Sequence, residues 1–451
     1  MELKNKRVLV VGLGRSGLSS ALFLRAQGAR VTVSDTRSAE ALAKEIPALL
    51  EAGIMVESGG HGLLTFRRQD LIVVSPGIPM DTPEVKQAQA FGLTVIGALE
   101  LGSRFLKGRV VAITGSNGKT TTTTLLGKIF EEAGRPTLVG GNIGLPVIDL
   151  VEKSTADTVS VLEVSSFQLE TIEEFHPWIA VVLNITPDHL DRHGSFENYA
   201  AAKTRITERQ EAEDFLVLNA EDKPTQMVAA KTRAQIFWFS TRRPVKQGAF
   251  VHGESIFFLP REGAKAEPVM PVAEIRLKGA HNVENVLAAV CAARLAGMAG
   301  ETIRASVAGF KGVEHRLEFV RNLRGVEFYN DSKATNVDAA MKAVASFAGG
   351  VHLILGGKDK GSPYDVMAAL LRERVKVVYT IGSAAEKIER ELQGVVKIVS
   401  AETIETAVAE ASKAAVAGDV VLLAPACSSF DQFENYEHRG QIFRQLANDL
   451  S

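Results

Sequence analysis

The chain has 451 residues, a length at which we expect about three domains of roughly 150 residues each. Hydrophobic residues make up 46% of the chain and charged residues 23%, as in ordinary globular proteins. The formal net charge is −2, from 51 basic and 53 acidic residues, so no global field favours nucleic acid or an anionic membrane. This balance argues against a nucleic-acid-binding protein.

Cysteine usage and the N-terminal segment bear on the compartment. The cysteines Cys291 and Cys427 are far apart in the sequence and outside any metal-ligand spacing, which indicates a reducing compartment without a disulfide framework. Residues 1–7 pass directly into a predicted strand without an apolar targeting segment, and no run of about eighteen apolar residues occurs. We therefore expect a cytoplasmic protein that is not inserted in a membrane.

The first hundred residues alternate short apolar runs with helix-like stretches. Strands are predicted at 8–11, 31–34, 71–74 and 94–96, and a helix is predicted over 16–27. Such alternation is typical of a parallel sheet covered by helices. We place the end of this first domain near residue 97.

The middle of the chain continues as a second α/β unit. Its predicted strands begin near residue 110 and recur at 158–162, 180–184 and 214–218, whereas the more polar stretch 241–271 predicts short strands or loops. We assign residues 98–312 to this second domain.

The last part of the chain has the same character. Strands are predicted at 351–355, 376–380 and 419–423, and an alanine-rich helix is predicted over 402–417. The pattern predicts a doubly wound α/β domain over 313–451. The whole chain is thus predicted to be an α/β protein of three domains.

A glycine turn lies near the N-terminus, in Gly12-Leu-Gly14-Arg-Ser-Gly17, and Asp35 ends the next strand about twenty residues later. Such a turn offers backbone N–H groups and a helix N-terminus to a diphosphate, so a UDP-sugar fits it as well as a nicotinamide cofactor does. A tight turn without a ligand is the alternative. Ser75-Pro-Gly77-Ile-Pro79 ends another strand of the same domain and is either a ligand loop or a proline-rich turn.

A second glycine turn, Gly115-Ser-Asn-Gly118-Lys119-Thr120-Thr121, follows an apolar strand and precedes a helix-like stretch. It departs from the common G-x-x-x-x-G-K-[ST] pattern because Ile113 stands at the first glycine position. Backbone N–H groups of such a turn surround phosphate oxygens, while the lysine adds a cation and the following threonine a hydroxyl ligand for Mg²⁺. The turn predicts a nucleoside triphosphate site.

Acidic and imidazole side chains follow later strands of the same domain. Glu163 ends one strand, and the cluster 184–193 with His189 follows the next. The carboxyl ends of parallel strands meet at one edge of a sheet, so these groups are expected near the phosphate site. Carboxylates suit Mg²⁺ better than histidine does. Glu163 is therefore a metal ligand or a helix cap, and His189 a metal ligand or a surface hydrogen-bonding group.

Together these motifs resemble those of the Mur ligases over essentially the whole chain. The resemblance rests on the segments Gly12 to Gly17, Thr114 to Thr120, Gly140 to Gly144, Leu162 to Glu170, His281 to Asn285, His315-Arg316, Asn330 to Asn336 and Ala424 to Phe433. It implies an N-terminal Rossmann-like domain, a central P-loop ATPase-like mononucleotide-binding domain and a C-terminal Rossmann-like domain.

The resemblance also implies an activity. Family members that add alanine, lysine or diaminopimelate typically carry aspartate with alanine-histidine or asparagine-proline where this chain has Asn330 to Asn336, and the signature Asp-Asn-Pro-Arg is absent. The implied reaction is the ATP-dependent addition of D-glutamate to UDP-N-acetylmuramoyl-L-alanine through an acyl phosphate and a tetrahedral intermediate, in peptidoglycan precursor synthesis. ATP, two Mg²⁺ ions and a monomeric protein are implied with it.

Roles for individual residues follow from the resemblance alone. The UDP-sugar is assigned to Gly14, Arg15, Ser16, Asp35, Thr36, Arg37, Ser75 and Gly77, and the muramoyl-peptide path to Asn142 and His189. ATP is assigned to Gly115, Ser116, Asn117, Gly118, Lys119, Thr120, Thr121, Asn282, Asn285, Arg316 and Asp331. D-glutamate is assigned to Lys333, Thr335, Lys360, Ser429 and Phe430, catalysis to Lys119, Glu163, His189 and Lys203, and metal binding to Thr120, Glu163, His189 and Lys203.

Lys203 stands where the family has a carbamylated lysine. Carbon dioxide addition turns an ammonium, which would repel Mg²⁺, into a carboxylate-like anion. Without the family, an exposed helical lysine is the default. Three rival functions remain at this point: a nicotinamide-dependent oxidoreductase, an ATP-switched binding module, and a related ligase that adds another amino acid.

Overall fold

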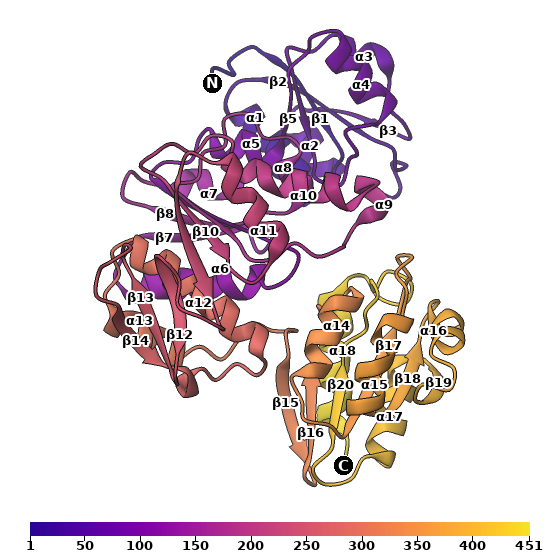
Figure 1. Ribbon diagram of the computed structural model, residues 1–451. Coiled ribbons are helices and arrows are strands. Elements are labelled where there is room, and N and C mark those ends of the chain that lie inside the picture. The colour runs from indigo at the N-terminus through magenta and orange to yellow at the C-terminus, as the bar shows by residue number, and fades with distance from the viewer. The chain divides into compact units, whose positions relative to one another are not determined.

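The computed structural model describes residues 1–451 and contains three sheets with helices between the strands (Figure 1). The chain forms two compact units, one of residues 1–185, 192–270 and 286–306, the other of residues 186–191, 271–285 and 307–451. The predicted α/β fold class with three sheets is confirmed, while the domain boundaries near 97 and 312 stay predictions. No helix is both long and apolar enough to span a membrane.

The first sheet has the strand order β3-β2-β1-β4-β5, with all neighbours parallel. Its elements are β1 (Arg7–Val11), α1 (Arg15–Ala26), β2 (Arg30–Asp35), α2 (Ile46–Glu51), β3 (Met55–Ser58), α3 (Leu63–Arg67), β4 (Leu71–Val74), α4 (Pro83–Ala90), β5 (Val95–Gly97) and α5 (Ala98–Ser103). Val8 and Val10 pack on one face with α1 and α2, whereas Leu9 and Val11 pack on the other with α3 and α4. The strand order reverses at β1, which places a ligand crevice at the carboxyl ends of β1 and β4.

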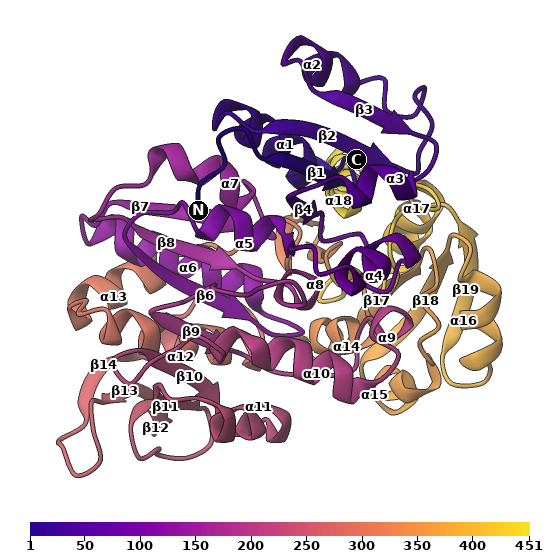
Figure 2. The same cartoon turned by 90° about the horizontal axis from the view of Figure 1, so that it is seen from above.

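The second sheet has the order β14-β13-β12-β11-β10-β9-β6-β8-β7, and Figure 2 shows β7, β8, β6, β9 and β10 side by side. Its strands are β6 (Arg109–Thr114), β7 (Thr137–Gly141), β8 (Val159–Glu163), β9 (Ile179–Val182), β10 (Phe215–Asn219), β11 (Gln235–Ser240), β12 (Gly248–His252), β13 (Ser255–Leu259) and β14 (Glu267–Pro271). The strands from β7 to β12 are parallel and β13 is antiparallel to β12. The loops after β6, β8 and β9 therefore leave the sheet at one edge.

Helices lie between the strands of this sheet in the sequence and follow its last strand. They are α6 (Lys119–Glu132), α7 (Val147–Leu150), α8 (Ser166–Leu169), α9 (Leu190–His193), α10 (Phe196–Thr204), α11 (Lys223–Val228), α12 (Ala280–Leu295) and α13 (Gly300–Ala308). Short 3-10 helices occupy Val151–Lys153, Arg205–Thr207, Ala229–Lys231, Val272–Glu274 and, in the third sheet's layer, Asp365–Met367. The stretch 241–271 forms the short strands β12 to β14, as the sequence suggested.

The third sheet has the order β15-β16-β20-β17-β18-β19, with β15 antiparallel and the rest parallel. Its elements are β15 (Glu318–Leu323), β16 (Val326–Asn330), α14 (Val337–Ala345), β17 (Val351–Gly356), α15 (Ala368–Arg374), β18 (Val375–Ile381), α16 (Ala385–Glu391), β19 (Lys397–Glu402), α17 (Ile404–Ala414), β20 (Val420–Leu423) and α18 (Tyr436–Asp449). Leu353 and Leu355 pack with α14 to α16 and Ile354 with α17 and α18, so helices cover both faces. The loops after β16, β17 and β20 share an edge.

A buried carboxylate organises the loop after α8. Glu100 on α5 has no exposed side-chain area and accepts hydrogen bonds from the backbone N–H groups of Glu173, Glu174 and Phe175 at 2.9, 3.0 and 3.1 Å. Arg104 donates to the same carboxylate at 2.6 Å. The carboxylate therefore satisfies three loop amides and neutralises one guanidinium.

We expect Glu100→Gln to lower the melting temperature by about 5 °C, because a carboxamide cannot accept all of these bonds and about 2 kcal/mol is lost. Differential scanning calorimetry measures the shift. Glu174→Gln is the matched control, since the side chain of Glu174 is 67% exposed. Equal melting temperatures for the two variants would contradict this role of Glu100.

Candidate active site

The first glycine turn is shaped by steric contacts that only glycine allows. Gly12 has a φ of +87°, and a Cβ on Gly17 would lie 2.0 Å from the carbonyl oxygen of Gly12. Gly14 is the N-cap residue of α1, so Arg15 and Ser16 form the first turn of that helix. The helix N-terminus is therefore directed to the crevice beside β1.

Asp35 is committed to the turn itself. Its carboxylate accepts the backbone N–H of Leu13 at 2.6 Å and is bound by Arg37 through the backbone N–H, Nε and Nη2 at 2.9, 3.1 and 3.0 Å. Burial opposes ionisation, but these bonds outweigh it and hold the pKa of Asp35 below its usual value. Since a carboxylate offers about four acceptor positions, little capacity is left for the ribose hydroxyls of a nicotinamide dinucleotide.

The other residues predicted for the UDP-sugar gather at the same edge of the first sheet. The hydroxyl of Ser75, which follows β4, donates to the carbonyl of Gly12 at 2.7 Å and so joins the two loops. Gly77 lies in the Ser75 loop, and Arg192 donates to the carbonyl oxygens of Gly77 and Ile78 at 3.3 and 2.9 Å. Thr36 directly follows β2 and is exposed.

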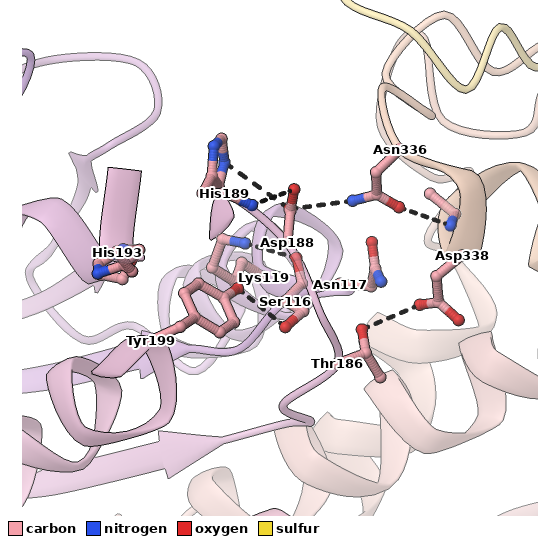
Figure 3. A network of polar contacts seen from close by, with 12 residues as sticks. Ser116, Asn117, Lys119, Thr186, Asp188, His189, His193, Tyr199, Asn336 and Asp338 are labelled. Atoms are coloured by element: carbon pink, nitrogen blue, oxygen red, sulfur yellow. Dashed lines mark hydrogen bonds and ion pairs between the residues drawn. The ribbon is translucent and has the colours of Figure 1, made fainter. Parts of the chain in front are cut away.

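The second glycine turn is held from the end of β9. Asn184 accepts the backbone N–H of Asn117 at 2.8 Å through its side chain and that of Ser116 at 2.9 Å through its carbonyl, and its amide donates to the carbonyl of Asn117 at 3.0 Å. Gly118, with a φ of +88°, caps α6, which begins at Lys119. Figure 3 shows Ser116 bonded to Tyr199, at 2.9 Å between the hydroxyls. The contacts with Asn184 thus fix the shape of the turn, and α6 begins directly after it, so a bound anion would meet the N-terminus of that helix.

Lys119 and Lys203 converge on this turn. The ammonium of Lys119 donates to the carbonyls of Gly115 and Ser116, both at 2.8 Å, and that of Lys203 donates to the carbonyl of Gly115 at 2.9 Å. Lys203 is 1% exposed and lies 4.6 Å from the ring centroid of Tyr199. The exposed-lysine interpretation of Lys203 is therefore wrong. Two ammonium groups that share one carbonyl repel each other, which makes this position suited to a change of charge.

Oxygen-bearing side chains meet beside the same turn. Thr120 donates to Glu163 at 2.6 Å, and Asn142 donates to the other carboxylate oxygen at 2.9 Å. Glu163 ends β8 and is 1% exposed. No group of three or more His, Cys, Asp or Glu side chains forms a metal cage. A hydroxyl with one carboxylate nevertheless fits Mg²⁺, which takes few protein ligands and completes its shell with phosphate and water oxygens.

The D-glutamate residues predicted from the resemblance lie around a cavity of about 600 Å³ in the unit of the third sheet. The cavity is lined by His189, Asp191, Thr335, Lys358, Asp359, Lys360, Ser428, Ser429, Phe430 and Tyr436. Lys333 is bonded to the Tyr436 hydroxyl at 3.0 Å, next to this lining. The cavity thus combines the ammonium groups of two lysines with hydroxyl and backbone groups, which suit the carboxylates of an amino acid, and with the carboxylates of Asp191 and Asp359, which suit its amine.

The four residues predicted to bind metal are not all in one unit. Thr120, Glu163 and Lys203 belong to the unit of the first two sheets, whereas His189 belongs to the unit of the third sheet. The structure therefore groups three of them, and the role of His189 as a metal ligand stays a prediction.

The remaining nucleotide residues belong to the second unit. Asn282 and Asn285 are buried and bonded to each other at 3.0 Å. Desolvation raises the pKa of Asp331 to about 6, against the opposing effect of Arg316 and of a backbone N–H. Arg316 and Asp331 are thus electrostatic neighbours, as a shared ligand would require.

The polar contacts of His193 were not predicted from the sequence. His193 is bonded through Nδ1 to Glu170 at 3.1 Å and through Nε2 to the hydroxyl of Ser166 at 3.0 Å, while Arg192 pairs with Glu170 at 3.1 Å. Both partners lie in segments already noted, Leu162 to Glu170 and 184–193. The signal in the sequence was a basic cluster after β9 together with an acidic residue in the segment after β8.

Comparison with protein families assigns each sheet. The Mur ligase MurD-like N-terminal domain matches residues 6–97, the Mur ligase middle domain residues 113–293, and the Mur ligase glutamate ligase domain residues 315–427. A pseudomurein peptide ligase type C from Methanothermus fervidus shares the fold, with a TM-score of 0.62, 21% identity and coverage of 99% of this chain and 100% of that one.

Full-length relatives are much closer in sequence. A UDP-N-acetylmuramoylalanine--D-glutamate ligase from Acidobacterium capsulatum is 66% identical over 447 residues, 99% of this chain and 97% of the relative. One of the same name from Koribacter versatilis is 60% identical over 451 residues, 100% of this chain and 99% of the relative. With three matching domains in order and full-length identity of this degree, the chain belongs to the Mur ligase family.

Proposed function

We infer that this protein is an ATP-dependent carbon–nitrogen ligase that adds D-glutamate to UDP-N-acetylmuramoyl-L-alanine in peptidoglycan precursor synthesis. The observation that carries the inference is the 66% identity over nearly the whole chain to a UDP-N-acetylmuramoylalanine--D-glutamate ligase. Use of ATP is a property of the family, and the preorganised turn from Gly115 to Gly118 supports it.

The chemistry must activate a poor electrophile, since a carboxylate does not accept an amine directly. In the proposal the terminal phosphoryl group of ATP passes to the L-alanyl carboxylate and gives an acyl phosphate. Lys119 and the N–H groups of its turn would hold the triphosphate and offset its repulsion from the carboxylate. The neutral amine of D-glutamate then attacks the acyl carbon, and phosphate leaves from the tetrahedral intermediate.

Magnesium binding by Thr120 and Glu163 is part of the proposal. Their contact of 2.6 Å gives a hydroxyl and a carboxylate oxygen in one place. A bound Mg²⁺ ion supplies charge compensation for the phosphate oxygens. Lys203, if carbamylated, would add a second anionic group next to the turn and hold a second ion, and His189 is proposed as a further contributor.

The second substrate is assigned to the cavity of the third sheet's unit. Lys360, Thr335 and the backbone of Ser429 and Phe430 would bind the carboxylates of D-glutamate, with Lys333 beside them. Asn282, Asn285, Arg316 and Asp331 are proposed for the nucleotide, and Asn142 for the muramoyl-peptide path. The first glycine turn, with Gly14, Arg15, Ser16, Asp35, Thr36, Arg37, Ser75 and Gly77 at its edge, would take the UDP group.

Phosphate release from ATP tests the proposed reaction. With UDP-N-acetylmuramoyl-L-alanine present, we expect D-glutamate to stimulate release at least about 100-fold more than L-glutamate, L-alanine or diaminopimelate, because discrimination rests on buried polar contacts. Mass spectrometry of the product provides the second readout. Stimulation by another of these amino acids would identify a related ligase instead.

Two other functions make different predictions. A nicotinamide-dependent oxidoreductase would bind NADH in a fluorescence titration. The four hydrogen bonds that the carboxylate of Asp35 already accepts argue against NADH binding. An ATP-switched binding module would bind nucleotide without phosphate release that depends on D-glutamate. A monomer in the cytoplasm is part of the proposal, and sedimentation equilibrium checks the first of these points.

A further inference from the structure

The segment Thr186–Asp191 is attached to the third sheet's unit by side chains. Asn336 donates through Nδ2 to Asp188 Oδ2 at 3.0 Å, and Thr186 donates to Asp338 at 3.3 Å (Figure 3). This segment belongs to the same unit as α14, although Ile185 and Arg192 on either side belong to the other unit. Two hydrogen bonds therefore join a short stretch of chain to the start of one helix.

Asn336 has a second role that fixes its orientation. Its Oδ1 atom accepts the backbone N–H of Ala339 at 2.8 Å, which makes it the N-cap of α14. Because that bond requires the oxygen, the amide nitrogen must face Asp188. Asn336 directly follows Thr335, which lines the cavity.

Asp188 in turn holds the backbone of His189. Its Oδ1 atom accepts the N–H of His189 at 3.0 Å. His189 has a φ of +52°, a left-handed backbone conformation that residues other than glycine rarely adopt. Such a conformation persists where neighbouring contacts impose it. The carboxylate of Asp188 thus links a strained residue that lines the cavity to the cap of α14.

We propose that Asn336 and Asp188 are a positioning pair that holds His189 at the cavity for the second amino-acid substrate. The inference rests on the proposed function, because it takes the cavity as the D-glutamate site. Neither residue is required to touch the reacting atoms. The pair acts by fixing where the segment Thr186–Asp191 meets Thr335 and the other lining residues.

Asn336→Asp separates positioning from folding. An aspartate keeps the capping oxygen for α14 but places a carboxylate against the carboxylate of Asp188. We expect the KM for D-glutamate to rise about tenfold, with the KM for ATP nearly unchanged. Asn336→Ser also keeps a capping oxygen but lacks the amide, so it should raise the KM for D-glutamate as well. It serves as the test if Asn336→Asp does not fold.

The exchange D188N/N336D is the decisive variant. It moves the amide to position 188 and the carboxylate to position 336, so the bond between them, the cap on Ala339 and the bond to the N–H of His189 all retain an acceptor. We expect it to restore the KM for D-glutamate to within about threefold of the wild type. A purely structural role would instead lower the melting temperature of the single variants and leave this KM unaffected.

Thr403→Asp is the matched control, since it adds the same charge at the N-cap of α17, an exposed position outside the cavity lining. Its kinetics should equal those of the wild type. An unchanged KM in both Asn336 variants, or an exchange no better than Asn336→Asp, overturns the positioning pair. Loss of D-glutamate dependence in the wild type would instead overturn the proposed function, so the two failures are distinguishable.

Discussion

Replacement of Lys119 by methionine is expected to lower the rate of D-glutamate-dependent phosphate release at least about 100-fold, the range found when one preorganised donor to a developing anion is removed. Methionine keeps most of the side-chain volume and removes the ammonium, which donates to the carbonyls of Gly115 and Ser116 at 2.8 Å. The glycine turn should keep its shape, because Asn184 braces it independently. Steady-state phosphate release measures the loss.

Lys128→Met is the matched control for this experiment. Lys128 lies on the same helix, α6, and its ammonium pairs with Glu132. This change should leave the rate within about twofold of the wild type, since a surface ion pair contributes little. Wild-type turnover in the Lys119 variant would contradict the assignment of this glycine turn as the phosphate site. It would also contradict the proposed role of ATP.

The strands that bear the site could be predicted because their signals are local. The strand before the second glycine turn is a continuous apolar run, and the structure gives β6 the bounds Arg109–Thr114. From the rule that parallel strands end at one edge, the contact between Thr120 and Glu163 could also be expected, although 43 residues separate them. Thr120 lies in the first turn of α6 and Glu163 ends β8, so the positions of these two elements alone bring the side chains together.

The edge strands β3, β7 and β15 could not be predicted in the same way. In β3 the side chain of Met55 is 67% exposed, and β15 alternates irregularly between exposed and half-buried residues, as edge strands commonly do. In β7 the last two residues are Gly140 and Gly141, which have low strand propensity. A Cβ on Gly141 would lie 2.3 Å from the carbonyl of Glu163, so close packing of neighbouring strands requires the glycine that hides the strand.

Contacts between distant loops were outside the reach of the sequence. Asn336 and Asp188 are 148 residues apart, and no periodicity indicates that segments so distant in the sequence contact each other. Similarly, Tyr436 and Lys358 in the cavity lining carry no motif that sequence reasoning could use. The burial of Lys203 also contradicts the usual exposure of lysine, and only its position in the family suggested a special role.

Lys203→Ala is expected to reduce ligation about 100-fold, an effect of the size seen when a group that supports a metal site is removed. In the structure its ammonium shares the carbonyl of Gly115 with Lys119 and is buried beside Tyr199, so the unmodified side chain places two like charges together. Carbamylation would replace this repulsion by attraction between a carbamate and the ammonium of Lys119. Small carboxylic acids such as acetate should then restore part of the activity of the alanine variant.

The rescue distinguishes charge from packing. Acetate should raise the rate of Lys203→Ala in a saturable manner, whereas an uncharged isostere such as acetamide should not, because only the anion replaces the carbamate. Lys231→Ala, at an exposed position, is the control that should neither lose activity nor respond to acetate. Carbon-13 NMR of the wild type in labelled bicarbonate should display a carbamate signal that the variant lacks. Full activity in Lys203→Ala would end the metal-bridging role, and equal rescue by acetamide would assign the defect to lost volume beside the glycine turn.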